Sequence, residues 1–338
     1  MMNSLEMCAG AGGQALGLER AGFEHAVLVE WEAAACNTLR YNRPHWNVHE
    51  GDLTQFDARR FRGIELVAGG VPCPPFSKAG KQLGADDERD LFPQALRVVD
   101  ETRPLAVMLE NVRGLLDPMF APYRKKISDQ LAALGYWTDW HLFNAADFSV
   151  CQLRPRVVLV GLRADIAPFF HWPAPALQPQ PTVGHLLGDL MAANGWQGAH
   201  AWSRAANTIA PTLVGGSKKH GGPDLGPTRA RAAWAALGVN GSSLAEEAPA
   251  ADFMGMPRLT VRMCARVQGF PDDWHFVGKK TPAYRQVGNA FPPPVAHAVS
   301  AQIALAIEAH ASAKLMKCAQ RAWAEVLAND VSPRGALK

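Results

Sequence analysis

One cysteine of this 338-residue chain lies in a run of prolines: Cys73 is the third residue of the segment VPCPPFS at positions 71–77. Proline fixes φ near about −65° and disfavours helix at the residue before it, so Cys73 is expected on a stiff, non-helical loop. Such a loop suits a thiolate nucleophile. A lone cysteine is more often a small buried apolar side chain, and only the other motifs of the chain decide between the two.

Charged groups that could work with a thiolate follow later in the chain. Glu110 ends a short apolar run, and Arg154 and Arg156 precede the apolar run that begins at Val157. If these runs are strands of one sheet, their carboxylate and guanidinium groups lie at the same edge as Cys73. A guanidinium donates in a planar fork and suits a carbonyl oxygen or a carboxylate, although such arginines, taken singly, are typical of a protein surface.

The N-terminal part has the features of an adenosine-binding site. A glycine-rich turn at 10–13 follows the first apolar run and would let backbone approach a ligand at a helix N-terminus. Glu30, Trp31 and Asp52 follow the next two runs, where carboxylates can bind ribose or adenine and an indole can stack. Ordinary polar strand ends are the alternative. The glycine spacing does not match GxGxxG, which disfavours a dinucleotide oxidoreductase.

The elements that must position these groups alternate between short apolar runs and longer amphipathic stretches up to residue 163. This alternation predicts βα units and a mostly parallel sheet, an α/β fold. The candidate strands are Leu5–Cys8, Ala26–Glu30, Asn47–Glu50, Leu66–Gly69, Ala106–Glu110, Trp137–Phe143 and Val157–Leu162. Prolines and glycines then predict a second, irregular domain. Helical periodicity returns at 259–269 and 292–309, and a peripheral tail is expected after about residue 311.

Composition restricts the class of protein. Hydrophobic residues make up 48% of the chain, enough for a sizeable core, and six cysteines without CxxC spacing indicate neither a zinc site nor a disulfide framework. No signal-peptide pattern and no apolar run of membrane-span length is recognised, so a cytoplasmic location is expected, without a membrane partner. The net charge of +3 is mild, but local pairs such as Lys218 and Lys219 could contact phosphates or simply lie on a solvated surface.

Taken together and in order, these motifs resemble the DNA (cytosine-5)-methyltransferases. The resemblance rests on the glycine turn, Glu30-Trp31, Asp52, PCPPFS, GKQ at 80–82, ENV at 110–112, QLRPR at 152–156, the segment 258–271 and QVGNAFPPP at 286–294. It implies a Rossmann-like methyltransferase fold with a mostly parallel seven-stranded sheet and a small target-recognition domain. It also implies S-adenosyl-L-methionine as cofactor, S-adenosyl-L-homocysteine as its product, double-stranded DNA as substrate, and no metal.

The same resemblance implies a mechanism. Cys73 would add to C6 of a cytosine flipped out of the duplex, so that C5 can attack the methyl group. Glu110 would hold N3 and the exocyclic amine, and Arg156 would hold O2. Positive charge from Arg154 would help to form the thiolate.

Further residues receive binding roles from the resemblance. The cofactor pocket would comprise Cys8, Gly10, Ala11, Gly12, Gly13, Glu30, Trp31, Asp52, Leu53, Pro72, Leu91 and Asn289. DNA would be contacted by Ser77, Lys78, Lys81, Gln82, Thr212, Lys218, Lys219 and His220. Residues 1–163 and 258–312 would form the catalytic domain, 164–257 the target-recognition domain and 313–338 a tail, with the helix after Pro292 packed beside the glycine turn.

Two positions depart from the family pattern: Cys8 replaces a phenylalanine beside the glycine turn, and Met263 replaces a glutamate that would brace the second domain. A transfer-RNA cytosine methyltransferase and a catalytically silent DNA-binding homologue are the alternative functions. The Pro- and Gly-rich second domain argues against the first, and the presence of Cys73, Glu110 and Arg156 against the second. A monomer is expected, and a separately acting cognate endonuclease is a candidate partner.

Overall fold

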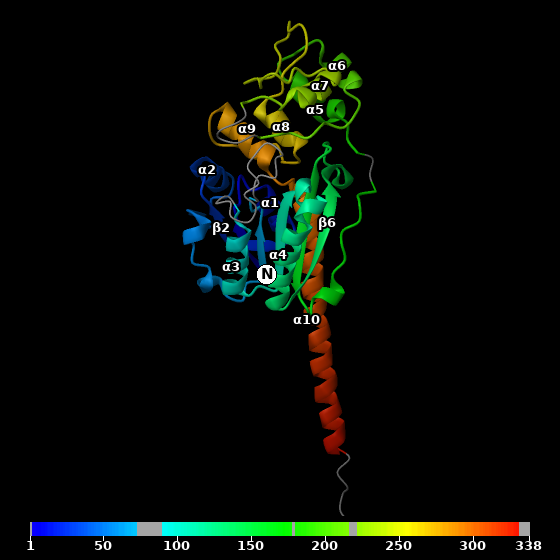
Figure 1. The fold of residues 1–338 in the computed structure, drawn as a ribbon. Helices are drawn as coiled ribbons and strands as arrows, with labels where there is room; N and C mark the ends of the chain where they lie inside the picture. The colour runs from blue at the N-terminus through cyan, green and yellow to red at the C-terminus, as the bar shows by residue number, and fades with distance from the viewer. Residues whose placement is uncertain (1, 73–89, 178–179, 216–221, 331–338) are drawn as a thin grey trace, which may run out of the picture.

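The computed structural model describes residues 2–72, 90–177, 180–215 and 222–330, which form a seven-stranded sheet in the order β3-β2-β1-β4-β5-β7-β6 (Figure 1). The strands are β1 (Met2–Met7), β2 (Phe23–Glu30), β3 (Val48–Glu50), β4 (Leu66–Gly69), β5 (Ala106–Val112), β6 (Tyr136–Asn144) and β7 (Pro155–Arg163). Strands β1 to β5 run parallel, whereas β7 is antiparallel to both of its neighbours. The prediction of a mostly parallel α/β sheet is confirmed, and every candidate strand overlaps an observed one.

Helices cover both faces of this sheet, and the central strands therefore have nearly continuous apolar sequences. The helices are α1 (Gly13–Arg20), α2 (Ala33–Asn42), α3 (Phe92–Thr102), α4 (Ala121–Ala133), α5 (Val183–Ala192), α6 (Ala199–Ala205), α7 (Thr228–Ala236), α8 (Val261–Val267), α9 (Lys280–Asn289) and α10 (Pro293–Asp330). On one face, side chains of α1 and α10 share a buried cluster with β4, β5 and β7. On the other face, α3 and α4 pack against the same strands. The result is a three-layer body.

The first and last helices of this body lie side by side. A Cβ built on Gly17 of α1 would collide with the Cβ of Ala296 and approach the backbone nitrogen of His297 within 2.7 Å, both in α10. Glycine at this position lets the two helices meet backbone to backbone. The expected packing of the C-terminal helix beside the glycine turn is therefore observed, and the sheet body includes residues from both ends of the chain.

The second lobe lies beyond the carboxyl edge of the parallel strands (Figure 1). Its described part contains α5, α6 and α7, while α8 and α9 lie between it and the sheet. A single buried cluster includes Leu16 and Leu39 of the sheet body together with Trp202 and Trp234 of the lobe. Arg266 of α8 also forms an ion pair with Asp189 of α5. The lobe is thus attached through apolar and ionic contacts.

Helix α10 extends well beyond its expected end. It continues to Asp330, so the predicted tail begins within a helix, which in Figure 1 leads away from the body. Its buried face ends near Ile307, and Leu315 and Met316 are exposed. Contrary to the sequence expectation, the stretch 280–321 is long and apolar enough to resemble a membrane span. However, 61% of its most apolar 18-residue window is buried inside the protein, as in a core helix.

Candidate active site

The carboxyl edge of the parallel strands gathers the motifs identified in the sequence. Strand β1 leads into the glycine turn, β2 into Glu30-Trp31, β3 into Asp52, and β5 ends at ENV. Because β7 runs antiparallel to β5, its first residues lie at this same edge, and Arg156 pairs with Val112 in the register. The sheet topology therefore brings the acidic and basic candidates together.

Glu110 and Arg156 form a largely buried ion pair at this edge, with Arg156 Nε 2.7 Å from Glu110 Oε1. Burial raises the pKa of Glu110, and the positive charges of Arg156 and Arg154 only partly oppose this effect. Burial likewise lowers the pKa of Arg156. A Cβ on Gly70 would lie 3.2 Å from Glu110 Oε2, so the carboxylate sits directly beside the segment that leads into Cys73.

That segment is held at its base by two hydrogen bonds. Asn111 Nδ2 donates to the carbonyl of Val71 at 3.0 Å, and the backbone N–H of Leu91 donates to the carbonyl of Pro72 at 3.1 Å. Asn111 was not assigned a role from the sequence, although it is the second residue of the ENV motif. Cys73 lies outside the described residues, as do the expected DNA contacts Ser77, Lys78, Lys81 and Gln82.

Arg154 is fully buried and binds the backbone of two other segments. Its guanidinium donates to the carbonyls of Leu213 at 2.8 Å, Gly288 at 2.7 Å and Ala290 at 3.1 Å. Burial lowers the pKa of Arg154. This geometry makes Arg154 a brace between the entrance of β7, the second lobe and the end of α9. The catalytic role expected for it at Cys73 stays a prediction.

Two buried amides complete this junction, and sequence reasoning missed both. Gln152 Nε2 donates to Gln268 Oε1 at 2.6 Å, while Gln152 Oε1 accepts the backbone N–H of Leu213 at 2.8 Å. Gln268 also donates to the carbonyl of Ala290. The available signal was a glutamine in each of two recognised motifs, at the start of QLRPR and in the segment 258–271.

The glycine turn divides into one open position and two packed ones. Gly10 has a left-handed φ of +54°, and no described atom lies within 4 Å of a Cβ built on it. A Cβ on Gly12 would lie 2.7 Å from Leu39 Cδ2 and 2.9 Å from Trp274, and one on Gly13 would collide with the carbonyl of Phe291. Gly10 therefore leaves room for a ligand, whereas Gly12 and Gly13 are required by packing.

Glu30 connects the glycine turn to the end of β2. Its Oε2 accepts the N–H of Gly10 at 2.7 Å, and its Oε1 accepts those of Trp31 at 2.9 Å and Glu32 at 2.8 Å. Burial raises the pKa of Glu30, and these backbone hydrogen bonds oppose the rise. The carboxylate is thus fixed in orientation, and the next residue, Trp31, is 70% exposed.

The other expected pocket residues surround this edge. Asp52 is exposed and accepts the N–H of Thr54 at 2.8 Å, which caps the short 3-10 helix η1 (Leu53–Gln55). Leu53 is buried, and Ala11 accepts a hydrogen bond from Trp274 Nε1 at 3.1 Å. Trp274 was missed from the sequence because it lies outside the recognised motifs.

Cys8, Pro72, Leu91 and Asn289 lie at the ends of elements. Cys8 adopts a left-handed φ of +52°, and burial raises the pKa of its thiol. Pro72 is exposed and Leu91 half-buried. Asn289 is exposed at the end of α9, and its Oδ1 would lie 2.6 Å from a Cβ on Gly215.

In the second lobe, Thr212 donates its hydroxyl proton to the carbonyl of Leu153. Lys218, Lys219 and His220 lie outside the described residues. At the family departure, Met263 Sδ accepts the N–H of Thr260 at 3.4 Å, and Thr260 Oγ1 accepts the N–H of Met263. A weak sulfur acceptor at the start of α8 therefore takes the place of the carboxylate that the resemblance implies. Within the described residues, no three His, Cys, Asp or Glu side chains are grouped to hold a metal ion.

Comparisons with known proteins place this geometry in a family. The family model described as C-5 cytosine-specific DNA methylase matches residues 2–305. The chain is 59% identical over 308 residues to the Type II methyltransferase M.NgoMIV of Neisseria gonorrhoeae, covering 90% of this chain and 98% of that protein. It is 55% identical over 309 residues to the Type II methyltransferase M.NaeI of Lentzea aerocolonigenes, covering 90% and 75% of the two chains.

Solved structures share the fold at low sequence identity. A DNA modification methyltransferase encoded within an E. coli prophage superposes with a TM-score of 0.64 at 21% identity, covering 91% of this chain and 100% of that one. A DNMT2 variant of Spodoptera frugiperda superposes with a TM-score of 0.62 at 15% identity and the same coverage. With the family match and these relatives, the chain belongs to the C-5 cytosine-specific DNA methylases and is a DNA (cytosine-5)-methyltransferase.

Proposed function

We propose that Cys73 is the nucleophile of this DNA methyltransferase and adds to C6 of a cytosine flipped out of the duplex. Addition of the thiolate makes C5 nucleophilic, and C5 then accepts the methyl group. Loss of the C5 proton and departure of the Cys73 thiolate release 5-methylcytosine. The observation that supports this proposal is the buried Glu110–Arg156 pair, which lies beside Gly70 and hence beside the segment leading to Cys73.

Glu110 and Arg156 bind the base and stabilise the charge that the attack creates. Arg156 donates to O2, while Glu110 holds N3 and the exocyclic amine. Because burial raises the pKa of Glu110, protonation of its carboxyl group is favoured once the base takes the place of Arg156 beside it, and this proton is then shared with N3. Negative charge that the thiolate pushes into the ring is then stabilised at both N3 and O2.

We propose S-adenosylmethionine as the methyl donor, and the residues present fit it. The cofactor supplies an electrophilic methyl group on a sulfonium. The open backbone at Gly10 admits a ligand, the fixed carboxylate of Glu30 suits ribose hydroxyls, and the exposed indole of Trp31 suits adenine stacking. Asp52 and Leu53 would bind the polar edge of adenine. Cys8, Ala11, Pro72, Leu91 and Asn289 would complete the pocket, with Gly12 and Gly13 shaping its turn.

The second lobe, about residues 164–257, would read the DNA sequence, with Thr212, Lys218, Lys219 and His220 as contacts. Lysines that meet phosphates fix the register of the duplex, and polar groups that reach base edges select the target. We propose that the enzyme acts as a cytoplasmic monomer and protects DNA against a separately acting endonuclease. The Type II names of its relatives support this pairing.

The proposal predicts that Cys73→Ala abolishes methyl transfer while DNA affinity stays within about threefold, because the thiolate acts in the chemical step. Bisulfite sequencing of duplex DNA treated with the purified enzyme reports the methylated position and the target together. Transfer RNA serves as the competing substrate. Cys318→Ala, at an exposed cysteine of α10, is the matched control and should methylate normally. Normal activity of Cys73→Ala would exclude the covalent mechanism.

A further inference from the structure

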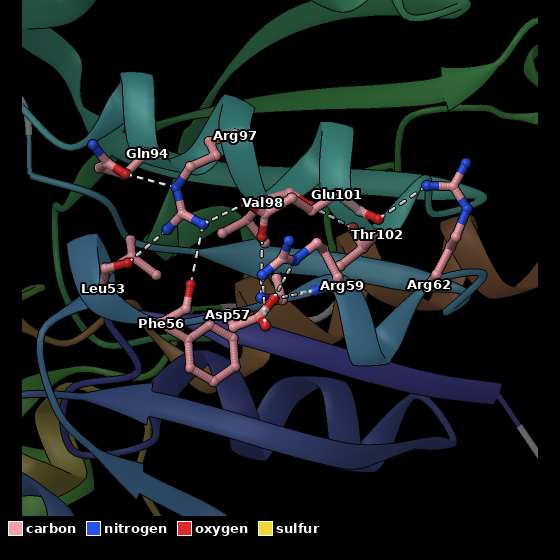
Figure 2. Close-up of polar contacts among 11 residues, drawn as sticks. Leu53, Phe56, Asp57, Arg59, Arg62, Gln94, Arg97, Val98, Glu101 and Thr102 are labelled. Carbon is pink, nitrogen blue, oxygen red and sulfur yellow. Dashed lines mark hydrogen bonds and ion pairs between the residues drawn. The ribbon is translucent and has the colours of Figure 1, made fainter.

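Arg97 of α3 holds a segment that no sequence motif connects to it. Figure 2 shows its guanidinium between α3 and the turn after β3. Arg97 donates from Nη2 to the carbonyl of Leu53 at 2.8 Å and from Nη1 to the carbonyl of Phe56 at 3.1 Å. Both acceptors belong to the turn that begins at Asp52. The guanidinium therefore connects this turn to α3 through two separate hydrogen bonds.

Two neighbours on α3 fix the orientation of this guanidinium. Gln94 Oε1 accepts from Arg97 Nε at 2.8 Å, and Glu101 Oε1 accepts from Arg97 Nη1 at 2.8 Å. The other carboxylate oxygen of Glu101 accepts the N–H of Ala58 at 3.0 Å, farther along the same segment. Arg97 thus uses the planar fork of its donors, an arrangement that lysine cannot reproduce with a single ammonium group.

The hydrogen bonds of Arg97 to Leu53 and Phe56 form a clamp, and helix α3 connects this clamp to the segment that leads into Cys73. The helix begins directly after Leu91, whose N–H binds the carbonyl of Pro72, the residue before Cys73. On the other side of the clamp, Asp52 and Leu53 form the proposed adenine end of the cofactor pocket. Arg97 therefore joins the turn that would hold the cofactor to the helix that anchors the nucleophile segment.

We propose that Arg97 is a positioning residue for cofactor binding: by holding the carbonyls of Leu53 and Phe56, it fixes Asp52 and Leu53 in the orientation that binds adenine. This inference rests on the proposed function, because it assumes that Asp52 and Leu53 face the cofactor. A carbonyl released from Arg97 lets the short η1 turn rotate, and the Asp52 carboxylate, which caps that turn, moves with it. Cofactor affinity then falls before overall stability does.

Equilibrium binding of S-adenosylhomocysteine to the purified full-length protein, measured by isothermal titration calorimetry, tests this proposal. Arg97→Lys keeps the charge beside Glu101 but loses the fork, and we expect its Kd to rise at least tenfold. Glu101→Gln removes the ion pair but leaves both carbonyl hydrogen bonds, and its Kd should stay within about threefold. Arg59→Met is the matched control, because Arg59 pairs only locally with Asp57 on the surface of the same segment.

Stability and the KM values for cofactor and DNA show whether the loss of affinity is specific to the cofactor. Urea unfolding should place Arg97→Lys close to the wild type, and its KM for cofactor should rise while its KM for DNA stays within about twofold. If Arg97→Lys leaves the Kd unchanged while Asp52→Asn weakens binding, the inference is overturned. Asp52 then belongs to the cofactor pocket, but the hydrogen bonds of Arg97 do not contribute to cofactor affinity. If Asp52→Asn also binds normally, the proposed pocket itself is wrong and the inference falls with it.

Discussion

At the scale of single residues, the site depends on two opposite charges kept out of water. An ion pair as buried as Glu110–Arg156 loses much of its attraction to the cost of desolvation, so its presence is weak evidence for a stabilising role. At a strand edge, however, the same pair offers one acceptor and one donor at a fixed separation. A cytosine that presents N3 and O2 would replace their mutual contact with two contacts of its own.

Replacing Glu110 by glutamine should lower kcat by at least about a hundredfold, because an amide cannot transfer a proton to N3. Since burial raises the pKa of Glu110, the wild type should lose activity as pH rises through that raised value, and Glu110→Gln should lack this alkaline decline. The stability of the protein should change with pH in the same direction. The contribution of Glu110 to the free energy of unfolding is fully present below the pKa that its carboxyl group has in the unfolded chain, and it is lost as pH rises through the raised pKa of the folded protein.

The kcat of both proteins measured between pH 5 and about pH 9 at saturating DNA and cofactor provides the check. Asp100→Asn is the control carboxylate, since Asp100 forms an exposed pair with Arg103 at the far end of α3. A Glu110→Gln protein that retains the alkaline decline would assign that decline to another group.

The sequence predicts which residues gather at this edge of the sheet but not what each side chain binds there. Glu110 and Arg156 were expected together because strand order and direction follow from apolar runs and strand-end motifs. Arg154, only two residues earlier, was expected beside them, yet it lies buried among backbone carbonyls of Leu213 and Gly288. Those acceptors are distant in sequence and carry no side-chain signature, so no local pattern could reveal them.

At the scale of elements, the fold was most predictable where periodicity was strong. The central strands lie in apolar runs because helices cover both faces, and each run was recognised. Helices α5, α6 and α7 were not anticipated, since they are short and separated by proline and glycine. The end of α10 was placed too early because its amphipathic pattern stops where the buried face stops, near Ile307, although the backbone stays helical.

Replacement by alanine should have different effects at Gly17, which lies in helix α1, and at Gly10, which lies in the turn before it. Gly17→Ala should lower the free energy of unfolding by about 2 kcal/mol or more, because its Cβ would collide with Ala296 of α10. Gly10→Ala meets no described atom and suffers only the cost of a left-handed φ, roughly 1 kcal/mol, but its methyl group would occupy the proposed ligand space. Gly10→Ala should therefore mainly weaken cofactor binding, whereas Gly17→Ala should mainly lower the free energy of unfolding.

Urea unfolding and calorimetric titration with S-adenosylhomocysteine measure the two quantities on the same samples. Gly22→Ala, at another left-handed glycine with open space but on the far side of α1, is the control for backbone strain alone. If Gly10→Ala and Gly22→Ala bind the cofactor equally well, the space above Gly10 is not part of the pocket.

At the scale of the whole molecule, the proposed function requires two lobes to keep one orientation while a base enters between them. Their junction has an apolar part and a polar part. The polar part consists of Arg154, Gln152 and Gln268, which together bind carbonyls or N–H groups of Leu213 and Ala290. Such buried networks are directional, so they specify an angle between lobes that apolar packing alone leaves adjustable.

Replacing Arg154 by lysine should therefore change the relation between the lobes as well as stability. A lysine ammonium carries its three donors on one nitrogen, so it cannot reach all of the carbonyls that Arg154 binds from two nitrogens, and we expect a loss of about 3 kcal/mol in the free energy of unfolding. Under the proposed function, DNA contacts both lobes, whereas the cofactor pocket lies within one. DNA affinity should accordingly fall at least tenfold while cofactor affinity changes less than about threefold. Arg266→Met, which removes the ion pairs of Arg266 with Asp189 of α5 and with Asp272 but leaves this network, should lose about 1 kcal/mol and little DNA affinity. Urea unfolding followed by tryptophan fluorescence, DNA anisotropy titrations and calorimetry with S-adenosylhomocysteine measure the three effects. Equal losses of DNA and cofactor affinity in Arg154→Lys would mean that the network supports the catalytic domain itself rather than the angle between the lobes.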